Sequence, residues 1–315
     1  MPAERTLLDD GRWHWQHGPI DIVVQAEGDA PVLAEAHEAA WQRFAGILDE
    51  LVGELRLLRQ PVAARHTLKG PIAQRMWRAC TDASGVVGSP FITPMAAVAG
   101  SVAQELIAFY QRPGIRRAWI NNGGDIALHL APGQSARVGL FADLSRFDPL
   151  SHRGPLQTYG QFEVRSDSPV RGIATSGWRG RSFSLGIADS VTVLAAGASQ
   201  ADAAATLIAN AVDVQDAGIR RLPASQCKDD SDLGDIPVTV DVAPLAPTQV
   251  QHALAAGVLQ ARALQRAGLV WAAALVCQGQ WRVVQPLSSA VRGEEDQAAL
   301  PPAFTQGHAV GSVFA

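Results

Sequence analysis

Long stretches of helical periodicity, interrupted by short apolar segments, restrict the folds open to this chain. From Val32 to Leu58 the apolar side chains recur every three or four residues, which predicts one amphipathic helix that ends before Pro61. Residues 247–267 show the same periodicity. Because helices and strands follow each other irregularly, we predict an α+β fold with a mixed or antiparallel sheet packed by helices. The strands are predicted at 117–121, 125–130, 136–142, 160–166, 189–195, 269–276 and 280–285.

Weaker signals predict the remaining elements. Thr93-Pro94 is typical of an N-cap and first helical residue, and it predicts a helix that continues to Phe109. Small residues between 96 and 103 fit either tight packing of this helix on the sheet or a helix start that faces a ligand. The other predictions are one or two strands within 12–27, helices at 69–80 and 199–212, a surface loop at 224–237 and a hairpin at Gln278-Gly279.

The composition is that of a folded chain with a sizeable core. Of the 315 residues, 47% are apolar and 18% are charged, which argues against disorder. We predict a single α+β domain over residues 1–285, with two closely packed subdomains as an alternative. A Gly-, Pro- and Ala-rich tail is predicted at 286–315.

Charge and cysteine content exclude several classes of function. The net charge of −4 gives no electrostatic reason to expect a nucleic acid or an anionic membrane as partner. The three cysteines are too far apart for a disulfide framework or a metal site. No secretory signal opens the sequence, and the longest apolar run, Gly268–Cys277, is too short to cross a bilayer. We therefore expect a cytoplasmic protein, and a homodimer is left open.

Three short motifs combine glycine with polar residues. Asn122-Gly123-Gly124-Asp125 fits a hairpin turn, or a turn that a ligand can approach closely. Gly172 to Gly177 includes Thr175 and Ser176, and it fits a Ser/Thr turn or a loop around a ligand.

The third motif is Ser199-Gln-Ala-Asp202-Ala-Ala-Ala-Thr206. Asp202 and Thr206 are four residues apart, so both side chains leave one helix face, where they fit a Mg²⁺ site. Ser199 and Asp202 also fit a capping box at the start of the helix.

These segments, taken in order, resemble the FAD:protein FMN transferases of the ApbE superfamily. The sequence is more similar still to the uncharacterised UPF0280 family within it, through Pro94–Ser101, Ser182–Val191, Ala201–Asn210, Leu233–Thr239 and Gly268–Leu275. The resemblance covers about residues 60–285.

The resemblance implies an ApbE-like fold with a flavin-nucleotide cleft and a magnesium site. Asp202 and Thr206 would be side-chain ligands of Mg²⁺, with a backbone oxygen near Ala174 completing the site. Arg179 and Arg181 would suit the anionic groups of a ligand. The cleft would be lined by Asn122, Gly123, Gly124, Asp125, Thr175, Ser176 and Gly177.

One departure from the flavin transferases bears on the reaction. Their His-x-x-Asp-Pro segment follows the Ala-Thr-Ser-Gly loop, yet Ser176–Val191 contains no histidine. We therefore expect FAD and FMN to bind weakly, with dissociation constants above about 1 μM.

Three functions stay open on this evidence. The chain is an enzyme acting on a flavin or another anionic small molecule in a Mg²⁺-assisted cleft, a non-catalytic flavin carrier or assembly factor for a redox-enzyme partner, or an FAD-dependent flavinylating enzyme.

Overall fold

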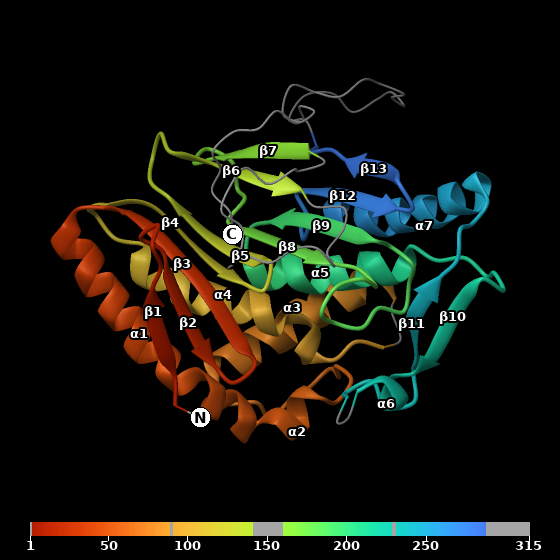
Figure 1. Ribbon diagram of the computed structural model, residues 1–315, viewed down its shortest axis with the longest axis horizontal. Coiled ribbons are helices and arrows are strands. Elements are labelled where there is room, and N and C mark those ends of the chain that lie inside the picture. Colours follow the sequence, from red (N-terminus) through yellow and green to blue (C-terminus); the bar gives the residue numbers. More distant parts are fainter. Residues whose placement is uncertain (1, 89–90, 141–159, 229–230, 288–315) are drawn as a thin grey trace.

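A nine-stranded antiparallel sheet runs through the molecule (Figure 1). The computed structural model describes residues 2–88, 91–140, 160–228 and 231–287. The α+β class and the sheet packed by helices are confirmed, and all neighbouring strands of the large sheet pair antiparallel. In spatial order the strands are β1 (Glu4–Leu7), β2 (Trp13–His17), β3 (Ile20–Gly28), β4 (Ile115–Asn122), β5 (Asp125–Leu130), β8 (Gly172–Ser176), β9 (Ser190–Ala195), β12 (Ala272–Cys277) and β13 (Gln280–Val284).

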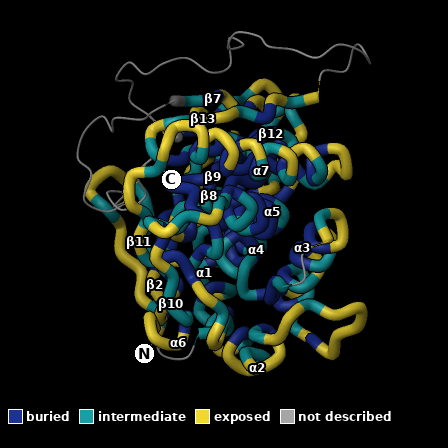
Figure 2. The backbone as a smooth tube through the Cα atoms, turned by 90° about the vertical axis from the view of Figure 1, so that its right-hand side faces the viewer, coloured by how far each residue is buried: buried dark blue, intermediate teal, exposed yellow. Residues whose placement is uncertain are grey.

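Helices pack on one face of this sheet. α1 (Ala30–Gly53), α3 (Pro71–Val87) and α4 (Val98–Ile107) pack against β2 to β5, through a cluster that includes Phe44, Met76 and Ile120. α5 (Ala198–Ala211) and α7 (Pro247–Arg266) pack against β8, β9, β12 and β13, through a second cluster that includes Ile208 and Leu264. Figure 2 shows α4, α5, β8 and β9 as the buried centre of the molecule.

The opposite face is covered by an antiparallel hairpin of β6 (Ser135–Leu140) and β7 (Gly160–Arg165). Strand side chains alternate between faces, so Trp119, Leu128 and Ile173 contact this hairpin while their neighbours face the helices. The remaining elements are α2 (Leu55–Leu58), η1 (Pro94–Ala97), η2 (Ala108–Tyr110), β10 (Ile219–Pro223), α6 (Ala224–Cys227) and β11 (Pro237–Val242), with β10 and β11 forming a separate pair.

Two predicted helices differ in their ends. The helix predicted to reach Leu58 stops at Gly53, because Glu54 leaves helical geometry and its carboxylate accepts hydrogen bonds from the amides of Lys69 and Gly70. Gly70 is the N-cap of α3, so this carboxylate caps a second helix, and α3 itself runs on to Val87. The contacts of Glu54 at the end of α1 and at the start of α3 join residues that are distant in the sequence.

The start of the helix predicted at Thr93 also differs. Thr93 occupies the N-cap position of η1, but its hydroxyl donates to Asp232 rather than capping the turn. The first turn is a 3₁₀ helix, and α4 begins at Val98.

Several strands were not predicted. β1 and β10 carry few apolar residues, whereas β11 has valine at every second position, an alternation that is typical of a strand. β8 is rich in glycine and hydroxyl side chains, so its sequence fits a Ser/Thr turn or a loop around a ligand instead. The predicted surface loop at 224–237 begins with the short helix α6. The predicted tail lies outside the described residues from residue 288 onward. No helix in the described part of the chain is long and apolar enough to span a membrane.

Candidate functional site

The large sheet opens between β5 and β8, and a cavity of about 660 Å³ lies at this opening. β8 pairs with β9 from Gly172 to Ser176, but it pairs with β5 only at Ile126–Ile173 and Ala127–Gly172. Beyond that point the amide of Thr175 donates to the side chain of Asp125, 3.1 Å away. A carboxylate thus takes the place of a strand partner, and the separated strands leave room for the cavity.

The turn between β4 and β5 forms one wall of the cavity. Gly123 and Gly124 both have positive φ, at 67° and 110°, and the amide of Gly124 donates to Asn121 Oδ1 at 2.7 Å. Two positive φ angles in a two-residue hairpin favour glycine. A Cβ atom on Gly123 would lie 2.7 Å from an Nη atom of Arg181. The motif is therefore a hairpin turn and also a wall that a side chain approaches closely.

The start of α4 forms another wall, because Val98 and Ala99 line the cavity. α4 also packs tightly on α5, and a Cβ atom on Gly100 would lie 2.3 Å from the carbonyl oxygen of Ala198. Gly100 therefore allows close packing of α4 on a neighbouring helix, while the start of α4 lies at the cavity wall.

Asp202 joins these two helices. α5 begins at Ala198 with Gly197 as its N-cap, so the predicted capping box of Ser199 and Asp202 is wrong. The carboxylate of Asp202 instead accepts hydrogen bonds from the amides of Gly100, at 2.9 Å, and Ala99. Those amides lie in the first turn of α4, which has no side-chain cap of its own. Asp202 therefore caps α4 from the neighbouring helix.

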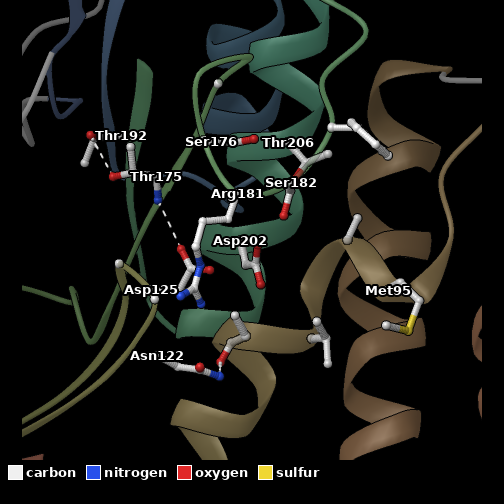
Figure 3. Close-up of a pocket in the computed structure, with 18 of the residues that line it drawn as sticks. Met95, Asn122, Asp125, Thr175, Ser176, Arg181, Ser182, Thr192, Asp202 and Thr206 are labelled. Atoms are coloured by element: carbon white, nitrogen blue, oxygen red, sulfur yellow. Dashed lines mark hydrogen bonds between the residues drawn. The ribbon is translucent and has the colours of Figure 1, made fainter. Parts of the chain in front are cut away.

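Asp125 and Asp202 line the same cleft, where the charge of Asp125 acts on Asp202 (Figure 3). Burial raises the pKa of Asp125 to about 7, although the Thr175 amide and the charge of Arg181 act against that rise. Burial first, and then the charge of Asp125, raise the pKa of Asp202 well above its usual range. Figure 3 shows both carboxylates and Arg181 in the same part of the cleft. Two like charges placed together in this way favour a bound cation or proton.

The structure brings most of the predicted site residues to this one cavity, although they come from three separate motifs and, for Arg181, from the segment after the second motif. It is lined by Asn122, Gly123, Gly124, Asp125, Thr175, Ser176, Gly177, Arg181, Asp202 and Thr206.

Arg179 and Ala174 are not brought into the cavity lining. A tight turn, closed by the Gly180 amide on the Gly177 carbonyl, separates Arg179 from Arg181. Arg179 pairs with Asp189 at 3.2 Å and lies over the ring of Trp178. Ala174 is fully buried against the helices and pairs with Val193 within the sheet.

Sequence reasoning missed several residues of the cavity lining. Thr192 could have been found from the sequence, because its strand was predicted. In the structure its hydroxyl lies 2.9 Å from that of Thr175. Arg59 and Lys228 lie in segments without a motif, so nothing local marked them. The missed lining residues with polar side chains include Arg59, Thr93, Thr192, Asn210, Lys228 and Asp232.

The donor set suits a hard cation that shares its coordination with a ligand. Thr206 lies one turn from Asp202 on α5, and both line the cavity with Asp125. Within the described ranges there is no group of three or more His, Cys, Asp or Glu side chains that could hold a metal. The protein would thus supply two carboxylates and a hydroxyl, which fits Mg²⁺ completed by water and phosphate oxygens.

Curated relatives of this chain are UPF0280 proteins. The Methanospirillum hungatei protein is 38% identical over 126 residues, which cover 40% of this chain and 47% of the relative. The Methanothermobacter thermautotrophicus protein is 40% identical over 150 residues, covering 47% and 51%. The Methanopyrus kandleri protein is 34% identical over 194 residues, covering 60% and 69%. The chain spans about half the length of the first curated relatives it matches.

Solved structures with a similar course of the chain include two ApbE proteins. The ApbE protein of Thermotoga maritima is 13% identical, with a TM-score of 0.46 over 90% of this chain and 96% of that chain. The flavinyl transferase ApbE of Pseudomonas stutzeri is 10% identical, with a TM-score of 0.44 over 90% and 94%.

A family model described as "AbpE bacteria" matches residues 5–283. The match covers nearly all of the described chain, and the curated relatives confirm the predicted resemblance to UPF0280 proteins. The chain therefore belongs to the AbpE bacteria family.

Proposed function

We propose that this protein is an ApbE-like enzyme that acts on a phosphate-bearing small molecule, with a flavin nucleotide as the first candidate. The observation that carries the proposal is the pair of carboxylates, Asp125 and Asp202, which line one cavity together with Arg181. A site with two carboxylates beside a positively charged side chain suits an anionic ligand that is bound through a metal ion.

Each polar residue has a defined part in this proposal. Asp202 and Thr206 would hold Mg²⁺ from one face of α5, with Asp125 opposite them. Bound Mg²⁺ would neutralise phosphate charge and polarise the phosphorus–oxygen bond that is broken. Asp202 is already held by two amides of α4, so its carboxylate is oriented before any ligand arrives.

Arg181 would bind the ligand's phosphate groups. Its side chain is exposed at the cavity and lies against Gly123, where a planar guanidinium can donate two parallel hydrogen bonds. Lys228 is a second cation of the cavity lining. Arg59 lines the cavity too, and three positive side chains favour a ligand with more than one negative charge, such as a diphosphate.

The shared motifs put flavin nucleotides first among such ligands, but the proton acceptor of the reaction is open. No histidine or cysteine lines the cavity within the part of the chain that the structure describes. A carrier that delivers flavin to a redox enzyme is the second candidate, because binding requires no proton acceptor.

Metal-dependent stabilisation tests the proposed site. Mg²⁺ together with FAD should raise the melting temperature of the wild type, but not that of Asp202→Asn. Thr206→Val should lose part of the shift, because it removes a hydroxyl and keeps the shape. Thr81→Val is the matched control, since Thr81 lies on α3 away from the cavity lining. If Mg²⁺ shifts no protein with FAD, FMN or pyrophosphate present, Asp202 is only a helix cap.

Turnover separates the enzyme from the carrier. Under excess FAD the enzyme should release AMP over many cycles, because attack of water on the pyrophosphate bond of FAD yields FMN and AMP. A carrier would bind FAD in a stoichiometric ratio and release none. Flavinylation would release AMP only when a protein with a reactive hydroxyl is added.

A further inference from the structure

An irregular segment between β8 and β9 carries part of the cavity lining. Residues 177–189 contain no helix or strand, and we call residues 181–185 within them the arginine segment. The amides of residues 181–184 have no hydrogen-bond partner in the part of the chain that the structure describes. The arginine segment is therefore held by contacts at its ends. The residues that it contributes to the lining are Arg181, Ser182, Phe183 and Leu185.

One side chain of α5 holds the far end of the arginine segment. Asn210 Oδ1 accepts hydrogen bonds from the Leu185 amide at 2.9 Å and from the Ser184 hydroxyl at 3.2 Å. Ser184 is buried, and its hydroxyl oxygen in turn accepts from the Gly186 amide. A Cβ atom on Gly186 would lie 2.1 Å from the carbonyl oxygen of Ala209, so the chain lies directly on the last turn of α5 here.

Asn210 belongs to the same face of α5 as the proposed metal ligands. Asp202, Thr206 and Asn210 follow each other at intervals of four residues, and all three line the cavity. Figure 3 shows Asp202 and Thr206 of this face together with Arg181 and Ser182 of the arginine segment. Asn210 thus connects the helix face that carries the proposed metal ligands with the segment that carries Arg181.

We propose that Asn210 is a positioning residue, which holds the arginine segment on α5 so that Arg181 keeps its place relative to the metal ligands. The inference rests on the proposed function, in which Arg181 binds the phosphate groups of a metal-bound ligand. An arginine on a loose segment would lose conformational freedom when it binds, and that loss lowers affinity. Two hydrogen bonds to one side-chain oxygen restrict the segment before any ligand arrives.

Asn210→Leu tests the proposal, because it removes the acceptor and keeps a side chain of similar size. Affinity for Mg²⁺–pyrophosphate is measured by titration calorimetry. We expect it to fall about tenfold, close to the loss of one charge-assisted hydrogen bond of Arg181. Ser184→Ala removes one of the two donors to Asn210 and should lose less affinity, and it gives a second measurement if Asn210→Leu folds poorly.

Gln265→Leu is the matched control for a loss of stability. Gln265 is buried on α7, and its Nε2 donates to the carbonyl oxygens of Trp271 and Gln285, at 2.8 and 2.6 Å. Like Asn210, it joins irregular chain to a helix through two hydrogen bonds, yet it does not line the cavity. This variant should be less stable than the wild type and bind Mg²⁺–pyrophosphate equally well.

A double-mutant cycle separates positioning from a general structural role. If Asn210 acts through Arg181, Asn210→Leu should cost little further affinity for Mg²⁺–pyrophosphate in an Arg181→Gln background. Equal losses in the two backgrounds, or wild-type affinity of Asn210→Leu, would overturn the proposal.

Trypsin cleavage after Arg181 tests the same role without a ligand. We expect cleavage at least about threefold faster in Asn210→Leu than in the wild type and in Gln265→Leu, because the arginine segment is held less tightly. Equal cleavage rates in the three proteins would also overturn the proposal. Failure of the proposed function looks different. In that case Mg²⁺–pyrophosphate would not bind to the wild type, while the cleavage rates would still separate Asn210→Leu from Gln265→Leu.

Discussion

Asp125 and Asp202 each replace a main-chain partner that the fold lacks. Asp125 accepts from the Thr175 amide where β5 and β8 separate, and Asp202 accepts from the first turn of α4. Both hydrogen bonds hold the carboxylates inside the cleft, at the cost of the raised pKa values that burial produces. The same two side chains therefore support the fold and define the site.

Asp202 is expected to behave as a helix cap when no metal is present. Asp202→Ala should lower the free energy of unfolding by about 0.5–2 kcal/mol in EDTA, because two amides of α4 lose their acceptor. Asp202→Asn keeps an acceptor oxygen and should lose less. Urea unfolding of the three proteins measures the difference, and two variants as stable as the wild type would contradict the capping role.

Asp125 should make the metal-free protein less stable as pH rises. Its pKa is about 7 in the folded state, against about 3.9 in an unfolded chain. The folded state therefore binds the proton more tightly, so the stability that this proton contributes is fully present below about pH 4 and is lost as pH rises through 7.

The melting temperature in EDTA is measured from pH 5 to 8, where we expect a fall for the wild type and a smaller one for Asp125→Asn. Burial lowers the pKa of His37, which acts in the opposite direction in both proteins, so the difference between them reports Asp125 together with the effect of its charge on Asp202. Equal falls in melting temperature for the wild type and Asp125→Asn would contradict the assignment of this pH dependence to Asp125.

Among the elements, α4 and α5 approach each other closely. Gly100 meets the carbonyl of Ala198 and lies next to Asp202, so the position of the carboxylate depends on the absence of a side chain at residue 100. Glycine is otherwise unfavourable inside a helix, by about 1 kcal/mol relative to alanine. Its presence here is explained by packing.

Gly100→Ala is therefore expected to destabilise the protein by about 1–3 kcal/mol, the usual cost of overpacking. It should also weaken the response to Mg²⁺ with FAD, because α5 must move away from α4. Gly85→Ala on α3 is the matched control, since a Cβ atom there meets nothing within 4 Å. Calorimetry of both variants should show a loss for residue 100 and no loss for residue 85.

At the scale of the whole molecule, the cleft is built by two parts of one sheet. β4, β5 and α4 supply one side, and β8 and α5 supply the other, with only a short β5–β8 pairing between them. A ligand that contacts both sides should therefore stabilise both.

Hydrogen exchange tests this coupling. With Mg²⁺ and FAD, amide exchange should slow at residues 98–100 and 124–126, and equally at 173–176 and 202–206. The edge strands β1 and β13 serve as internal controls and should not change, because neither lines the cavity. Protection on one side alone would show that the ligand does not bridge the opening.

Local patterns in the sequence were enough to predict much of the fold. Apolar periodicity located α1 and α7, and the Asn-Gly-Gly-Asp motif located the β4–β5 hairpin. These signals succeed because helix faces, strand alternation and positive φ angles are properties of a few consecutive residues. The order of motifs also placed most of the predicted site residues in the cavity lining, Asn122 to Asp125 and Asp202 with Thr206 among them, although much of that lining carries no motif.

Only the tertiary structure decided what those residues contact. Asp202 caps a helix through an amide 102 residues away, and a turn separates Arg179 from Arg181. The indole N–H of Trp119 has no hydrogen-bond partner among the described residues. The sequence by itself determined the elements and the types of polar groups available. Their pairing depended on which strands separate and which helices touch, because hydrogen bonds, burial and pKa values arise between segments that meet only when the chain is folded.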